Sequence, residues 1–169
     1  RIYEGAFADL EERARRSYSR KRWEDTIPVI EQALERGQLE NVEIVRIERL
    51  VEMLRESYLG EVGGLQDRMR FEEAAEIARR GLEMFGRDGI LWLKLAEVSA
   101  ELELIHETID ALLKVRELES SRRIVPMLEG AYQELARKAL KAGDGRQAEL
   151  AYIDGLEQIP DSAILKFQL

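Results

Sequence analysis

The stretch Tyr132–Pro160, YQELARKALKAGDGRQAELAYIDGLEQIP, has the clearest residue spacing in the chain. Large and small residues recur at helical intervals on both sides of Gly143, and the stretch ends at a proline. Small residues at such positions let two antiparallel helices approach closely, while large ones fill the space between them. The stretch therefore predicts a helix, a glycine-containing turn, and a second helix that stops at Pro160. The positions that carry this spacing are Tyr132, Leu135, Ala136, Ala139, Ala148, Tyr152 and Gly155.

This pattern resembles one tetratricopeptide repeat, in which a large aromatic, a Leu-Gly pair, an aromatic, an alanine, another aromatic and a proline occupy fixed positions. An earlier stretch repeats the spacing of the first helix. Its members are Trp92, Leu95, Ala96 and Ser99. The resemblance implies a stack of antiparallel helix pairs that serves as a binding scaffold.

The second helix of each expected pair can be aligned on a small or β-branched residue, followed by residues four and seven positions further on. The distance from Ala74 to Thr108 is 34 residues, which is the tetratricopeptide period. The flanking distances are 48 and 40 residues, and we expect the glycine-rich segment 60–67 and the connection 120–125 to absorb the excess. The three aligned series are Thr26, Ala74, Thr108, Ala148; Ile30, Ala78, Leu112, Tyr152; and Ala33, Gly81, Val115, Gly155.

The expected fold is all-α, with antiparallel helix pairs stacked as a right-handed superhelix of about eight helices. We predict one domain over residues 1–169, with pairs at 2–37, 40–86, 89–119 and 126–160 and a capping or truncated helix at 161–169. Gly37 is expected to end the second helix, and Pro126 to start the seventh. The glycines at 60, 63 and 64 are expected to break the third helix and leave a flexible insertion. Ser162 is expected to cap the last helix.

Composition limits the kind of partner. The net charge is −8 and 36% of the residues are charged. An acidic balance argues against nonspecific binding to nucleic acid or to membrane surfaces, although a short basic turn occurs at Ser19–Arg22. The sequence contains no run of about 20 apolar residues, so we expect no membrane insertion.

The sequence fits more than one cellular compartment. The sequence has no cysteine, which excludes disulfides and thiolate chemistry and fits a reducing cytosol as well as an oxidising compartment. We favour the cytoplasm over the periplasm or a secreted location. The chain begins at Arg1 without a methionine, so we expect a fragment or a processed product.

No group of residues suggests catalysis. The single histidine, His106, has no evident nucleophile or metal partner, and the expected fold offers no strand for a phosphate-binding loop. The abundant carboxylates are expected on solvated helix faces. We therefore predict a protein that is not an enzyme and holds no cofactor or metal.

The candidate binding residues come from the first helix of each pair, because the resemblance implies that these helices line a concave groove. The register places a cationic wall on the seventh helix beside an anionic wall on the fifth. The positions that match the carboxylate clamp of some family members lack its asparagines, so that activity is not implied. The candidates are Arg15, Tyr18, Glu97, Glu101, Gln133, Arg137 and Lys141.

Three functions remain open. The first is an interaction scaffold or adaptor that binds a protein or peptide in this groove or docks in a larger assembly. The second is a self-assembling structural component, a homo-oligomer that uses the apolar tail after Pro160. The third is a regulatory domain of a larger enzyme or transcription factor.

Overall fold

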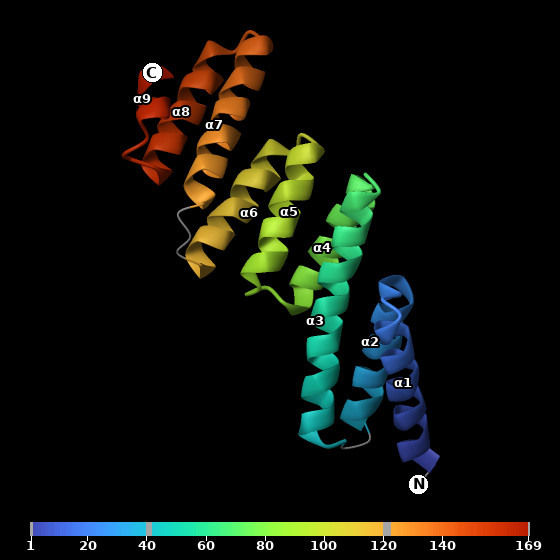
Figure 1. Ribbon diagram of the computed structural model, residues 1–169. Coiled ribbons are helices and arrows are strands. Elements are labelled where there is room, and N and C mark those ends of the chain that lie inside the picture. The colour runs from blue at the N-terminus through green and yellow to red at the C-terminus, as the bar shows by residue number, and fades with distance from the viewer. Residues whose placement is uncertain (1, 40–41, 120–122, 169) are drawn as a thin grey trace. The chain divides into compact units, whose positions relative to one another are not determined.

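The computed structural model describes residues 2–39, 42–119 and 123–168, and in these residues the chain is helical with no strand (Figure 1). Contacts divide the chain into two compact units, unit 1 with Arg1–Phe85 and unit 2 with Gly86–Leu169. The helices are α1 (Ile2–Ser19), α2 (Trp23–Leu39), α3 (Ile44–Asp67), α4 (Phe71–Met84), α5 (Gly89–Glu101), α6 (Ile105–Leu118), α7 (Ile124–Lys141), α8 (Gly145–Gln158) and α9 (Ala163–Gln168).

Unit 1 is built from α1 to α4, with α1 packed on α2, α2 on α3, and α3 on α4. Its core includes Phe7, Ile30 and Leu54, none of which is exposed. Tyr58 is buried in the same core, and its hydroxyl donates a hydrogen bond at 2.7 Å to Glu31, which also pairs with Arg80. Burial and the neighbouring Glu31 carboxylate raise the pKa of Tyr58. A buried hydroxyl with a charged acceptor thus links α2, α3 and α4.

Unit 2 repeats the same arrangement with α5 to α8, and the short α9 covers α7 and α8. The expected close approach of the helices in the last pair, α7 and α8, is confirmed. Tyr132 and Ala136 are buried, and a Cβ atom on Gly155 would lie 2.8 Å from Leu165 and 3.0 Å from the ring of Tyr132. Leu165 is fully buried, and the Ser162 hydroxyl accepts the backbone N–H of Leu165 at 3.2 Å, as expected for a helix cap.

The turns inside the four helix pairs share one backbone geometry. Each contains one residue with a left-handed conformation, and within the described residues only these four have one. In each turn the next residue donates its N–H to a carbonyl five positions back, the hydrogen bond that closes a helix in a Schellman motif. The left-handed residues are Lys21 (φ 54°), Met69 (φ 58°), Glu103 (φ 56°) and Gly143 (φ 78°).

These turns confirm the repeat alignment. Lys21, Met69, Glu103 and Gly143 each lie five residues before the first aligned position, so they have the same 48-, 34- and 40-residue separations. All residues of the three aligned series are buried. The tetratricopeptide-like all-α fold of antiparallel helix pairs is therefore confirmed.

The expected break at the glycine-rich segment is wrong, because α3 continues unbroken to Asp67. Val62 and Leu65 are buried on its inner face. Gly60 has a packing role, since a Cβ atom there would lie 2.5 Å from the indole of Trp23. The glycine lets α2 and α3 approach closely, and burial of the flanking apolar residues offsets the weak helix propensity of the other glycines.

Two boundary predictions also need correction. Gly37 lies inside α2, where a Cβ atom would collide with the side chain of Ile47, so it too serves close packing and not helix termination. Helix α7 begins at Ile124, which places Pro126 within its first turn, where the missing N–H has no helical partner to lose. Residues 120–122 of the expected connection lie outside the described residues.

Candidate partner-binding site

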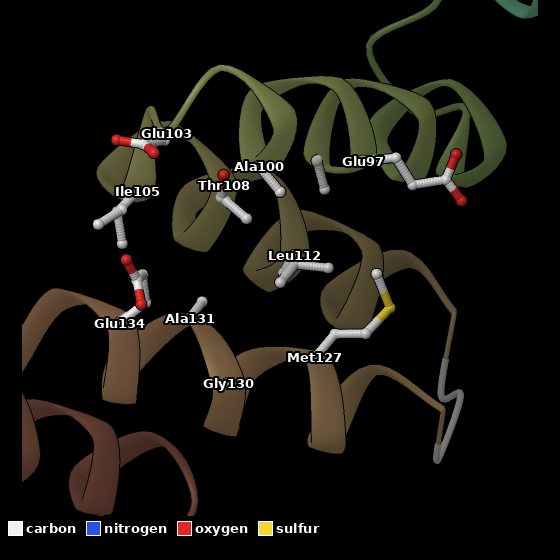
Figure 2. Close-up of a pocket in the computed structure, with 11 residues that line it drawn as sticks. Glu97, Ala100, Glu103, Ile105, Thr108, Leu112, Met127, Gly130, Ala131 and Glu134 are labelled. Atoms are coloured by element: carbon white, nitrogen blue, oxygen red, sulfur yellow. The ribbon is translucent and has the colours of Figure 1, made fainter. Parts of the chain in front are cut away.

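A hollow of about 450 Å³ lies between α5, α6 and α7 of unit 2 (Figure 2). Helix α6 supplies apolar side chains to it, including Ile105 and Leu112. Helices α5 and α7 line it with mostly small residues, and Met127 closes the floor toward one end. The volume falls in the range of pockets that take a small ligand or a few side chains of a peptide.

The hollow exists because its walls lack side-chain volume. Ala96 and Ala100 face it from α5, and Gly130 and Ala131 face it from α7. A Cβ atom on Gly130 would meet nothing within 4 Å, so this glycine borders open space and not a packed neighbour. The small residues of α5 and α7 thus leave a gap that neither helix fills.

Three carboxylates border this apolar floor, namely Glu97 on α5, Glu103 in the α5–α6 turn and Glu134 on α7. Glu103 and Glu134 lie toward the Ile105 end of the hollow, and Glu97 lies toward the other end (Figure 2). Lys94 forms an ion pair with Glu97, with 3.2 Å between Nζ and Oε2. Arg137 donates to Glu134 from Nε at 2.6 Å and also from Nη2.

The Arg137 pair keeps Glu134 charged. Its hydrogen bond lowers the pKa of the Glu134 carboxyl, and in return it raises the pKa of the Arg137 guanidinium. Both side chains are solvated, so the pair fixes the orientation of the carboxylate more than it stabilises the fold. Two of the three rim carboxylates, Glu97 and Glu134, are thus each paired with a cation of their own helix.

The structure brings two of the residues predicted for unit 2 to this hollow. Glu97 lines the hollow, and Arg137 donates a hydrogen bond to Glu134, which also lines it. Gln133 is half-buried on α7 but is not a lining residue. Glu101 and Lys141 are the exposed last residues of α5 and α7.

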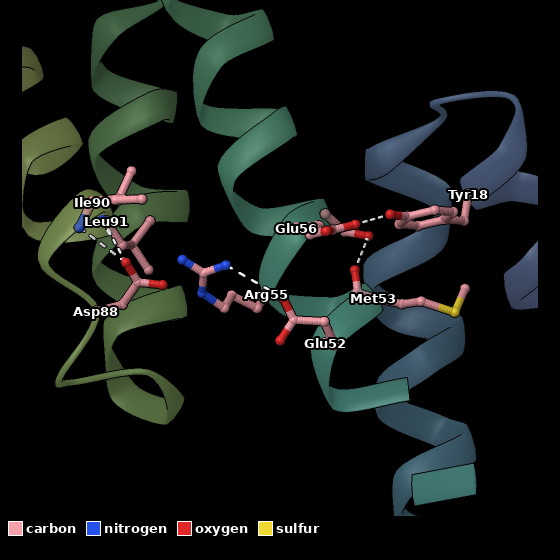
Figure 3. Close-up of polar contacts among 9 residues, drawn as sticks. Tyr18, Glu52, Met53, Arg55, Glu56, Asp88, Ile90 and Leu91 are labelled. Atoms are coloured by element: carbon pink, nitrogen blue, oxygen red, sulfur yellow. Dashed lines mark hydrogen bonds and ion pairs between the residues drawn. The ribbon is translucent and has the colours of Figure 1, made fainter. Parts of the chain in front are cut away.

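The two candidates in unit 1 make contacts of their own. Arg15 pairs with the buried Glu11 at 2.9 Å, and Glu11 also binds Arg46 at 2.5 Å. Burial alone would raise the pKa of Glu11, but the two guanidinium groups outweigh it and lower that pKa. Tyr18 donates to Glu56 (Figure 3), and its ring lies edge-on to Trp23 with centroids 5.5 Å apart. Arg15 therefore pairs within α1, whereas Tyr18 contacts both α2 and α3.

Sequence reasoning missed Glu103 and Glu134, and it missed the small residues that create the hollow. Lys138 also went unnoticed, although its Nζ reaches the carbonyl of Glu103 at 3.5 Å and links α7 to the α5–α6 turn. One signal was present in the sequence. Met127, Ala131 and Glu134 recur at helical spacing on α7, which marks a single face of that helix.

Other kinds of site find no support in the described residues. His106 is exposed on α6, and no group of three or more His, Cys, Asp or Glu among the described residues could hold a metal ion. No helix in the described ranges has the length and apolar character needed to cross a membrane.

Comparison with known proteins yields structural neighbours. No protein-family model and no curated protein sequence matches the chain. Among solved structures, it is similar to MamA of AMB-1 in a P212121 crystal form, with a TM-score of 0.42, 10% identity and 98% of each chain covered. It is also similar to TTC0263, a thermophilic TPR protein of Thermus thermophilus, with a TM-score of 0.33, 19% identity and 96% of each chain covered.

Proposed function

We propose that the chain is a protein-interaction scaffold that binds a short segment of a partner in the hollow between α5, α6 and α7. The observation that carries this proposal is the hollow itself, which has the exposed Met127 at one end and the buried side chains of Ile105 and Leu112 at its base. An apolar hollow flanked by polar residues is a common feature of ligand- and peptide-binding sites. Burial of one aliphatic or aromatic anchor there would supply most of the binding free energy.

The rim indicates the chemistry of that partner. The charged side chains that line the hollow are Glu97, Glu103 and Glu134, and each bears a negative charge. An apolar anchor with lysine or arginine on both sides would place its cations against these carboxylates. Such complementarity favours basic partners and disfavours acidic ones.

Selection from a random dodecapeptide phage library, with the chain as bait, tests this proposal. We expect the enriched peptides to share an apolar residue flanked by basic residues. A synthetic, fluorescein-labelled copy of the most enriched peptide would then be titrated with the protein. Enrichment of acidic peptides, or no enrichment at all, would contradict the proposal.

A glycine substitution can fill the hollow without harming the fold. Gly130→Leu places a side chain in open space on α7 and raises helix propensity, so the variant should be at least as stable as the parent. We expect it to weaken peptide binding by about tenfold or more, because the anchor loses its space. Gly63→Leu is the matched control, since Gly63 lies on α3 and also has nothing within 4 Å of its Cβ position. Equal peptide affinity of the two variants would show that the peptide does not bind in the hollow.

A further inference from the structure

A second hollow, of about 600 Å³, lies in unit 1 where α1 meets α2. Four arginines line it, three from α1 and its turn and one just before α2. They belong to the segment Arg13–Arg22, which contains six cationic residues and no acidic one in a chain whose net charge is −8. We call this surface the basic corner, and its arginines are Arg13, Arg16, Arg20 and Arg22.

The helix spacing explains why these guanidinium groups gather. Arg13, Arg16 and Arg20 are three and then four residues apart, so they share one face of α1 and its end. Arg15 lies off this face and pairs with Glu11. The left-handed Lys21 then reverses the chain and brings Arg22 to the same hollow.

Only part of this positive charge is neutralised within the unit. Arg16 pairs with Glu12 at 2.8 Å, and Arg22 pairs with Asp25 at 3.3 Å. In the part of the chain that the structure describes, Arg13 and Arg20 have no ion pair or hydrogen bond through their side chains, and both are exposed. Two like charges without partners on one face leave a local positive potential.

The rest of the lining narrows the choice of anionic ligand. Pro28 and Val29 add an apolar part, while the carboxylates of Glu24 and Asp25 stand at the border. A phosphate backbone would leave the apolar part uncovered, and no lining residue is an aromatic on which a base could stack. A short peptide can place carboxylates on Arg13 and Arg20 and an aliphatic side chain on Val29.

We propose that the basic corner is a second interaction surface, which binds an acidic segment of a protein through Arg13 and Arg20. It is independent of the hollow in unit 2, which has the opposite charge. A scaffold with both surfaces could hold a basic and an acidic segment at the same time.

Fluorescence anisotropy with a fluorescein-labelled octaglutamate peptide tests this proposal on the whole chain. We expect saturable binding at about 50 mM salt that weakens by about tenfold or more at 0.5 M, because exposed charges are screened over a few ångströms there. The double variant Arg13→Glu with Arg20→Glu should weaken binding by about tenfold or more, since it replaces two attractions with two repulsions. Helicity should not change, because neither side chain holds the fold together.

The matched control is Arg87→Glu with Arg146→Glu, which changes the net charge by the same amount at exposed positions of unit 2. Equal weakening by both double variants would show a general charge effect and overturn the proposal. Tighter binding of an eight-nucleotide thymidine oligomer than of octaglutamate would overturn it in favour of nucleic acid. Gly130→Leu should leave octaglutamate binding unchanged. The proposal for the basic corner can therefore fail or succeed independently of the proposal for the hollow in unit 2.

Discussion

The turn between α7 and α8 and the end of α3 use glycine in opposite ways. In the first, Gly143 occupies the left-handed position that closes the helix. In the second, Gly60, Gly63 and Gly64 continue a helix, and the left-handed position that follows belongs to Met69. The comparison shows that a glycine marks a turn only when the backbone needs its positive φ. Where a neighbouring ring needs the space, the same residue marks a close helix contact.

Among the substitutions that test this comparison, Gly60→Ala should change the free energy of unfolding most. The new methyl group would lie 2.5 Å from the indole of Trp23, and that ring is also held edge-on by Tyr18. We expect a loss of about 2 kcal/mol in the free energy of unfolding, because overpacking exceeds the gain in helix propensity. Urea unfolding followed by circular dichroism measures this, and Trp92→Phe leaves Trp23 as the fluorescent reporter of unit 1.

A double-mutant cycle with Trp23→Leu identifies the cause. If the clash with the indole is responsible, alanine at position 60 should cost much less once the ring is removed, which gives a coupling energy of about 1 kcal/mol. Additive effects of the two substitutions would mean that Gly60 is needed for some other reason, and the packing explanation of α3 would be wrong.

Gly143→Ala tests the other half of the comparison. With φ at 78° and nothing within 4 Å of its Cβ position, the expected loss of about 1 kcal/mol comes from backbone strain alone. Gly143→Asn should lose less, because asparagine tolerates the left-handed region. Unfolding of unit 2, followed through Trp92 in a Trp23→Phe background, would show whether the two variants differ in this order.

Much of the fold could be predicted from the sequence because the repeat leaves local signals. Residues such as Ala74 and Thr108 are 34 positions apart and occupy equivalent buried places. The continuation of α3 could not be predicted, because the ring that requires Gly60 belongs to Trp23, 37 positions earlier in the chain. Local sequence contains no trace of such a contact, so a glycine cluster on its own favours a turn.

The candidate site was less predictable for a related reason. Glu97 was found from its register on α5, but the hollow also needs α6 and α7. Its defining feature is missing volume at Gly130 and Ala131, and small residues also occur where two helices pack tightly. Gly155 and Gly130 illustrate this, since a Cβ atom would collide at the first and meet nothing at the second.

Gly64→Ala should have the opposite sign to Gly60→Ala although the two positions lie four residues apart on one helix. No atom lies within 4 Å of the Cβ position at Gly64, so alanine adds helix propensity without a clash. We expect about 0.7 kcal/mol of stabilisation, seen as a higher urea midpoint for unit 1. A loss of stability would indicate that the end of α3 does need flexible glycines.

Met69→Gly has the smallest expected effect and completes the comparison, because it places a glycine where the α3–α4 turn has φ of 58°. Met69 is 74% exposed, so its side chain contributes little burial. Relief of left-handed strain of about 1 kcal/mol exceeds the entropy that glycine adds to the unfolded chain, which leaves a net gain of about 0.5 kcal/mol. Met69→Ala is the control that removes the side chain but keeps the Cβ atom, and it should not be stabilised.

If both variants gained equal stability, the exposed methionine side chain and not its backbone conformation would be the source of instability. A gain by glycine alone would show that the four turns differ in sequence while sharing one conformational requirement.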